Sequence, residues 1–233
     1  MMKTLIEAAA IIIPLIFAIV FHEVAHGWMA RALGDPTAQE QRRLSLNPLR
    51  HVDPFGTIIL PGALHLAGLP VFGWAKPVPV NYSRLRNPKR DMALVGAAGP
   101  AINFVFAVLT AVIVGVTLRA LGPAGMPGPV LAFAMMTLIN FITVNISLGL
   151  FNLLPLPPFD GSRILRGLLP WPAARLLDRI EPFGIIVFFA IFVILPQVWP
   201  SLHLADRVLL PPVQWAGHQL DALITLIAGP QPV

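Results

Sequence analysis

Long apolar stretches dominate this chain, and shorter polar segments separate them. A helix needs roughly 20 consecutive apolar residues to cross a bilayer. The four clear stretches lie at about 5–33, 92–118, 130–154 and 183–198. A further apolar segment, 204–228, is either a fifth span or a helix at the membrane surface, because it also holds polar residues: Asp206, Arg207, His218 and Asp221. The pattern predicts an all-α polytopic membrane protein with about four to five transmembrane helices, built as a single domain over residues 1–233.

Composition supports a location in the lipid bilayer. Hydrophobic residues make up 56% of the chain and charged residues only 12%, against about 25% in soluble domains. The 25 prolines and 18 glycines predict broken helices and re-entrant backbone, which membranes tolerate only where protein or water satisfies it. The basic, amphipathic stretch 162–181 predicts a pair of interfacial helices. The chain has no cysteine, which excludes disulfides and thiolate metal sites.

Basic residues predict the orientation of the chain. Nine of the 16 Lys and Arg lie between Arg31 and Arg90, and four more follow the third span. Cytoplasmic loops hold an excess of Lys and Arg, so both regions are expected in the cytoplasm and the N-terminus outside. Residues 22–26 and 155–161 are thereby placed at similar depth on the cytoplasmic side. The net charge of +5 reflects this topology, and no nucleic-acid partner is expected.

The first span contains two histidines and a glutamate in the sequence HEVAH, residues 22–26. Residues four apart lie on one face of a helix, so the imidazoles of His22 and His26 can bind one metal ion. Glu23 lies beside them and can accept a proton from water, as in the H-E-x-x-H zinc peptidases. Ionisable side chains are costly inside a span, which argues against a merely packed polar cluster. Zinc is the usual metal for such ligands, and one Zn²⁺ per chain is expected.

A catalytic zinc needs a third protein ligand and an open position for water. The soluble metzincin pattern requires Gly and His where this chain has Met29 and Ala32, so that class is excluded. Asp160 is the favoured third ligand, because it ends a span at matching depth and follows prolines that hold the backbone out of a helix. Taken alone, the Asp-Gly pair is better explained as an ordinary turn at a helix end. His51 and Asp53 are the alternative ligands.

Two segments together resemble the site-2 protease family of intramembrane zinc metalloproteases: FHEVAHGWMARALGD (21–35) and NLLPLPPFDG (152–161). That family pairs an H-E-x-x-H helix with a later N-x-x-P-x-P-x-x-D-G motif, and every fixed position is matched. The resemblance continues through NPLRHVDPFGT (47–57), GWAKPVPVN (73–81) and GAAGPAINF (96–104). These segments are similar to the compact prokaryotic branch without a PDZ domain. The resemblance covers about residues 8–170, with 183–228 as additional C-terminal helices.

The resemblance implies roles for five residues. His22, His26 and Asp160 would be the zinc ligands, and Glu23 would be the general base. Asn152 would be a catalytic residue that holds the substrate carbonyl or its developing oxyanion. An interhelix hydrogen bond is the alternative role for this asparagine.

Between the first two spans, the resemblance implies a membrane-associated β-structured loop. The segment GWAKPVPVN would pair with an unwound substrate strand by strand addition. A structural turn with its lysine at the headgroups is the alternative. The residues expected to bind substrate are Gly73, Trp74, Ala75, Lys76, Pro77 and Val78. In the next span, Gly96, Gly99 and Asn103 are expected to pack against the helix that contains HEVAH.

The predicted reaction is hydrolysis of peptide bonds in or near transmembrane segments of membrane proteins. The resemblance implies single-span or similarly simple membrane protein substrates, and a location in the prokaryotic cell (inner) membrane with the active site toward the cytoplasm. The alternative is a non-enzymatic membrane protein that binds or transports metal. Transport would require further ligands along a path across the membrane, and the sequence offers few. The sequence names neither the substrate nor an oligomeric state.

Overall fold

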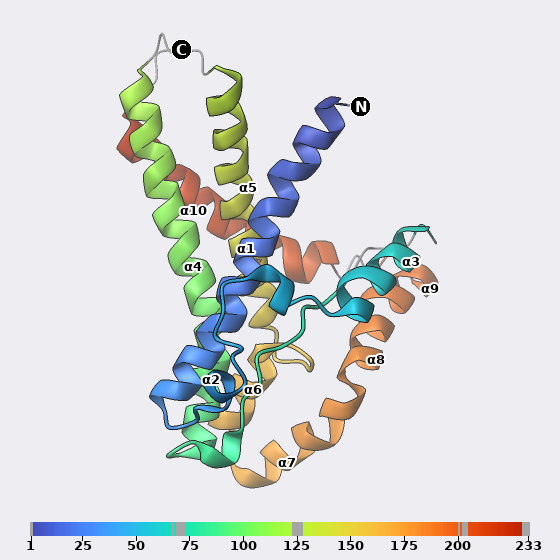
Figure 1. Cartoon of the computed structure of the whole chain (residues 1–233). Helices are drawn as coiled ribbons and strands as arrows, with labels where there is room; N and C mark the ends of the chain where they lie inside the picture. The colour runs from blue at the N-terminus through green and yellow to red at the C-terminus, as the bar shows by residue number, and fades with distance from the viewer. Residues whose placement is uncertain are drawn as a thin grey trace.

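The computed structural model describes residues 2–66, 68, 73–122, 128–199, 201 and 205–229. Helices dominate this part of the chain, and short 3-10 or π turns, labelled η, join some of them (Figure 1). The elements in chain order are α1 (Met2–Ala32), α2 (Thr37–Glu40), η1 (Pro48–Arg50), η2 (Pro54–Ile59), α3 (Leu60–Leu66), η3 (Tyr82–Arg84), α4 (Pro88–Leu121), α5 (Pro129–Asn152), α6 (Asp160–Leu168), α7 (Trp171–Ile180), η4 (Glu181–Phe183), α8 (Gly184–Phe189), η5 (Ala190–Ile194), α9 (Leu195–Val198), η7 (Ala205–Leu209) and α10 (Leu210–Ala228).

Among the residues that the structure describes, four helical segments are long and apolar enough to cross a membrane: Lys3–Ala32, Pro88–Leu121, Pro129–Asn152 and Trp171–Val198. They confirm a multi-pass membrane protein. The fourth begins at Trp171, earlier than expected, because α7 continues through η4 into α8 and α9. The basic stretch at 162–181 covers α6, α7 and the first residue of η4; α7 is continuous with the fourth segment, and the interfacial location of the stretch stays a prediction. The apolar tail forms α10, and its status as a fifth span also stays a prediction.

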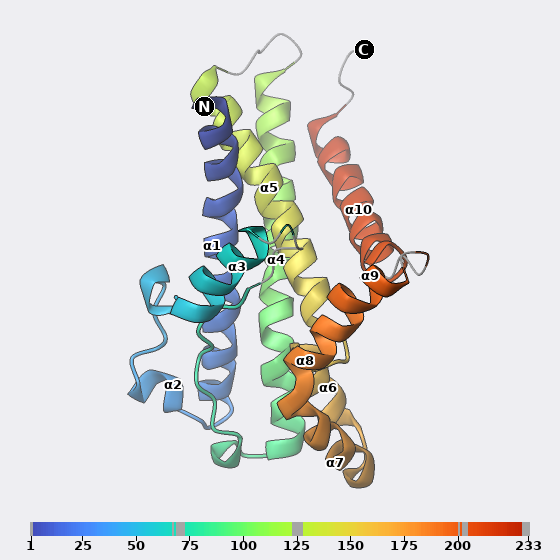
Figure 2. The ribbon, with the colours of Figure 1, turned by 90° about the vertical axis from the view of Figure 1, so that its right-hand side faces the viewer.

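Helices α1, α4 and α5 lie side by side and form the body of the molecule (Figures 1 and 2). The main apolar cluster joins α4 to α5 through Ala107, Ala111, Val114, Met135, Ile142 and Ile146. Small residues let helices approach closely where lipid offers no hydrophobic driving force. Helix α10 packs on the same cluster and crosses α4 at Gly115, where a Cβ would lie 2.8 Å from Ile227 Cβ. The start of α1 and the pair α6–α7 lie at opposite ends of this body.

A proline inside α1 creates a polar tie between helices. Pro14 has no N–H, so the carbonyl of Ala10 loses its usual helical donor. The side-chain Nδ2 of Asn140 on α5 donates to this carbonyl at 2.9 Å. Because an unsatisfied carbonyl is expensive in lipid, the asparagine both replaces the missing hydrogen bond and joins α5 to α1.

Residues 73–81 form an extended strap beside α1, and the prediction of a β-structured loop there is wrong. No strand occurs among the described residues. The amide of Trp74 donates to the carbonyl of Gly56, which lies in η2. The amide of Lys76 donates to the carbonyl of His51, at the end of η1. Such partners offer no extended edge, and the prolines in PVPV provide no N–H for a ladder. The backbone is extended, but no second strand pairs with it.

The far end of the strap is fixed by a buried carboxylate. Asp35, which is fully buried, accepts hydrogen bonds from the backbone amides of Asn81 at 2.6 Å and Thr37 at 3.0 Å. It thereby joins the turn after α1 to the end of the strap. The strap is thus held at both ends, which positions its middle beside HEVAH.

Candidate metal centre

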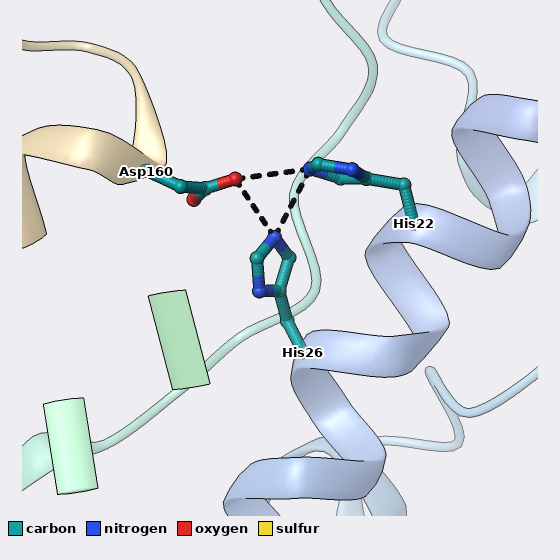
Figure 3. A group of neighbouring side chains, drawn as sticks. All are labelled: His22, His26 and Asp160. Carbon is teal, nitrogen blue, oxygen red and sulfur yellow. Dashed lines mark hydrogen bonds and ion pairs between the residues drawn. The ribbon is translucent and has the colours of Figure 1, made fainter. Parts of the chain in front are cut away.

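Two histidines and one aspartate meet where α1 faces the start of α6 (Figure 3). His22 and His26 lie one turn apart on α1, and Asp160 opens α6. The Oδ2 atom of Asp160 is 3.0 Å from His22 Nε2 and 3.1 Å from His26 Nε2, and the two Nε2 atoms are 3.1 Å apart. All three side chains are buried. The two motifs therefore meet in space although 134 residues separate His26 from Asp160.

The hydrogen bond made by Nδ1 of each histidine determines whether its Nε2 atom can bind a metal ion. His22 Nδ1 lies 2.6 Å from Asn103 Oδ1, and His26 Nδ1 lies 2.7 Å from the carbonyl oxygen of Val95. Both partners are acceptors, so each Nδ1 carries the hydrogen and each neutral Nε2 presents a lone pair. With Oδ2 of Asp160, three acceptor atoms face one another. Such an arrangement needs a cation or a proton shared between the three atoms.

The size and chemistry of this group fit zinc. Ligand atoms about 2.0–2.1 Å from a tetrahedral ion lie roughly 3.3 Å apart. The separations in the group, 3.0 to 3.1 Å, are close to that value. Two imidazoles and a carboxylate also form the ligand set of known catalytic zinc sites. Within the described part of the chain, no other trio of His, Asp or Glu converges in this way.

The carboxylate of Asp160 is held in place by its own helix. Arg163, three residues later, donates from Nη1 to Oδ1 at 2.8 Å, which leaves Oδ2 for the group. The positive charge of this guanidinium, within hydrogen-bonding distance of Oδ1, favours the ionised form of the carboxylate. The side chain is therefore the ionised ligand that a cation needs.

The turn before α6 folds back on the end of α5. A Cβ at Gly161 would collide with the carbonyl oxygens of Leu153 and Leu154, so only glycine fits directly after Asp160. The Pro-rich segment between α5 and α6 is non-helical, as its sequence predicts. Asp160 and Gly161 are the first two residues of α6 and do not form a separate Asp-Gly turn.

Gly99 of α4 lies against both histidines. A Cβ at this position would be 2.5 Å from His26 Nε2 and 2.6 Å from His22 Nε2. Gly99→Ala is therefore expected to displace the rings or separate α4 from α1, and to weaken zinc binding roughly 10-fold or more. Chelator competition on the purified chain measures this affinity. Gly62→Ala is the control, because a Cβ there meets nothing within 4 Å; equal affinities for the two variants would contradict the prediction.

A cavity of about 610 Å³ opens beside the three ligand candidates. It runs between α1 and α5, and the strap borders it. His22, Glu23 and Asp160 provide its ionisable wall together with Arg163, whereas most other lining residues are apolar. Four of the six predicted substrate-binding residues line it: Gly73, Trp74, Ala75 and Pro77. Val78 instead packs toward α1, where a Cβ at Gly27 would lie 2.8 Å from its Cγ1.

Glu23 and Asn152 border this cavity from opposite sides. Glu23 Oε2 accepts a hydrogen bond from the backbone amide of Val78 at 2.8 Å, so the strap orients the carboxylate. Asn152 donates from Nδ2 to Leu148 O, within its own helix, at 2.9 Å. An amide nitrogen has two hydrogens, so Asn152 retains one for a ligand in the cavity.

Comparison with known proteins agrees with this geometry. Residues 10–195 match the sequence profile of peptidase family M50. The chain belongs to peptidase family M50. Two relatives have names that state the chemistry. "Putative zinc metalloprotease YwhC" of Bacillus subtilis (strain 168) is 40% identical over 202 residues, 83% of this chain and 85% of YwhC. "Putative zinc metalloprotease Rip2" of Mycolicibacterium smegmatis (strain ATCC 700084 / mc(2)155) is 26% identical over 179 residues, 76% of this chain and 64% of Rip2. The comparison with solved structures gave no match.

The alternative ligands considered for this M50 chain do not join the group. His51 places Nε2 at 2.7 Å from Ser45 O, and the carboxylate of Asp53 accepts from Gly56 N at 2.6 Å to cap η2. Both side chains are therefore used by the local fold. Among the described residues, they do not meet the histidines of α1.

Several residues around the site of this M50 chain could not be predicted from the sequence. Arg163 has a local signal, the i, i+3 spacing from Asp160, but that spacing matters only if α6 begins at the aspartate. Asp35 and Asn145 have none, because their partners lie on elements distant in sequence. Asn103 was expected to pack, and the structure adds a contact with a metal-ligand candidate.

Proposed function

We propose that this M50 peptidase hydrolyses peptide bonds in or near membrane spans at the group formed by His22, His26 and Asp160, with one zinc ion bound there and Glu23 as general base. The observation that supports this most strongly is the buried triangle of three acceptor atoms at the wall of a cavity that also contains a glutamate. A purely structural cluster would not need three mutually facing lone pairs in a membrane protein.

Glu23 would move the proton in this reaction. When bound, zinc polarises the scissile carbonyl and makes a water molecule more acidic. Glu23 would accept a proton from the attacking water while the water oxygen bonds to the carbonyl carbon. As the C–N bond breaks, the glutamic acid would return that proton to the leaving nitrogen. The hydrogen bond from Val78 N–H keeps the carboxylate aimed while leaving its second oxygen for this transfer.

Asn152 would stabilise the substrate carbonyl. It lines the cavity on the α5 side and has an amide hydrogen beyond the one given to Leu148 O. A donor directed at a developing oxyanion is worth far more in a dry site than in water. We propose this role for Asn152 in preference to an interhelix hydrogen bond, since its hydrogen bond to Leu148 O stays within α5.

The strap would hold the substrate beside the zinc site. Its backbone is extended, and Gly73, Trp74, Ala75 and Pro77 lie on the cavity wall. An unwound substrate segment could lie along this wall, with its peptide bond exposed to the metal site. Lys76 and Val78 would support the strap from behind, through bonds to His51 O and Glu23.

The proposed substrates are single-span or similarly simple membrane proteins. The membrane setting follows from the family and the four apolar spans. The excess of Lys and Arg in residues 31–90 and 163–179 supports an N-terminus outside and a site toward the cytoplasm of a prokaryotic cell (inner) membrane. The single domain over 1–233 fits a body in which α10 packs on α4 and α5.

Removing and restoring the metal tests the proposal. The full chain, purified in detergent, is expected to contain about one zinc per chain and to cleave members of a panel of single-span proteins. A chelator should abolish cleavage, and added zinc should restore it. Metal-free protein that cleaves at the untreated rate would overturn the proposal. Zinc transport into vesicles without cleavage of any substrate would instead support the transport alternative.

A further inference from the structure

Two asparagines are fully buried in the spans beside the metal centre. Asn103 lies on α4 and Asn145 on α5, and neither side chain is exposed. A buried amide in a membrane span is costly unless all of its hydrogen bonds are made. Their contacts form one continuous series of hydrogen bonds from the backbone of α5 to the ring of His22.

Backbone carbonyls fix the donor-to-acceptor direction of this series of hydrogen bonds. A carbonyl oxygen only accepts, so the 2.8 Å contact with Phe141 O must come from the NH₂ group of Asn145. The Oδ1 atom of Asn145 then faces Asn103, which donates to it from Nδ2 at 2.8 Å. Ala18 O, 3.4 Å from the same Nδ2, favours the same orientation. Asn103 Oδ1 is left pointing at His22 Nδ1, 2.6 Å away.

The contact between Asn103 and His22, which ends this series of hydrogen bonds, determines the tautomer of His22. Because Asn103 presents an acceptor, Nδ1 of His22 carries the hydrogen and Nε2 keeps its lone pair. If the amide of Asn103 turned over, Nδ1 would have to accept, and the hydrogen would move to Nε2, the atom that faces Asp160. His26 does not depend on such a series, since Val95 O binds its Nδ1 directly.

We propose that Asn103 and Asn145 are positioning residues that lock His22 in the tautomer and ring orientation needed for zinc binding. This inference rests on the proposed function and adds a cause for it. Asn103 acts directly on the ring, whereas Asn145 acts one step further away by preventing rotation of the Asn103 amide. A hydrogen-bond partner of a ligating histidine typically changes metal affinity about 10- to 100-fold.

Zinc affinity of the purified full chain tests this, with chelator competition as the measurement. Asn103→Leu is expected to weaken zinc binding about 10- to 100-fold. Asn103→Asp keeps the acceptor oxygen and should recover most of that loss. Asn145→Leu should weaken binding by less, because Ala18 O still restrains Asn103. The visible spectrum of the Co²⁺-loaded protein should change in Asn103→Leu and return toward the wild-type spectrum in Asn103→Asp.

Asn140→Leu is the matched control, because it also removes an asparagine of α5 that bonds to α1, at Ala10, without contacting a histidine. It should leave zinc affinity unchanged. Wild-type affinity in both Asn103→Leu and Asn145→Leu would overturn the inference. An equal loss in Asn140→Leu would also overturn it, since general loosening of the helices would then be the cause. If Asn103→Leu fails to fold, Asn145→Leu and Asn103→Asp decide. Wild-type protein without zinc would refute the proposed function itself.

Discussion

Glu23→Gln is expected to abolish peptide-bond cleavage while the protein still binds zinc. The glutamine has the size of the glutamate, and its side-chain oxygen can still accept the hydrogen bond that Val78 N–H now gives to Oε2. The strap and the ligand group should therefore remain in place. What is lost is the ability to take a proton from water, a contribution of about 10²- to 10⁴-fold in rate. Cleavage of a single-span substrate and zinc content should be measured on the same preparation.

Glu7→Gln on the same helix is the control for this substitution. Glu7 is half exposed and lies 4.0 Å from Lys3, far along α1 from the histidines. It should cleave at the wild-type rate. Cleavage by Glu23→Gln within a few-fold of that rate would show that another group moves the proton.

Asp160→Ala is expected to release the metal. Loss of the third ligand removes a negative charge from the triangle and leaves the guanidinium of Arg163 without the partner it holds at 2.8 Å. Zinc affinity should fall by more than the roughly 10- to 100-fold typical of losing a partner outside the ligand shell, and cleavage should be lost with it. Total zinc in the purified chain measures occupancy, and competition with a chelator measures affinity.

Asp178→Asn provides a matched control on α7. Asp178 also pairs with an arginine, Arg166, but it lies outside the ligand group. This variant loses one ion pair and should keep its zinc. If Asp160→Ala kept full zinc occupancy, the ligand set would be wrong even if His22 and His26 both bind the ion. Comparison with Asp160→Asn separates the lost charge from the lost shape, because asparagine keeps the shape.

The main helices and the three ligand candidates could be predicted because their signals are local. Apolar stretches of membrane length, a four-residue spacing between His22 and His26, and prolines before Asp160 each require no knowledge of the rest of the fold. The distribution of Lys and Arg then placed the two motifs at the same depth. The structure confirms that these side chains meet.

Contacts that depend on partners from distant elements could not be predicted. Asn103 looked like a packing residue, since its role depends on Asn145, which lies 42 residues later on another helix. The strap was expected to form β structure because of the resemblance to the site-2 protease family, yet the residues that bond to its amides belong to helical turns. The burial of Asp35 likewise depends on where Asn81 is placed by the fold.

The strap also makes the number of residues in it important, apart from their identity. Its amide at Lys76 is fixed to His51 O, and the amide two residues later, at Val78, meets Glu23. Both neighbours of Val78 are prolines, which have no N–H. Inserting or deleting a single residue directly after Lys76 would therefore bring a proline to the glutamate and remove its partner. The orientation of the proposed general base thus depends on the spacing of the chain, and a change in length here should do more harm than most changes of side chain.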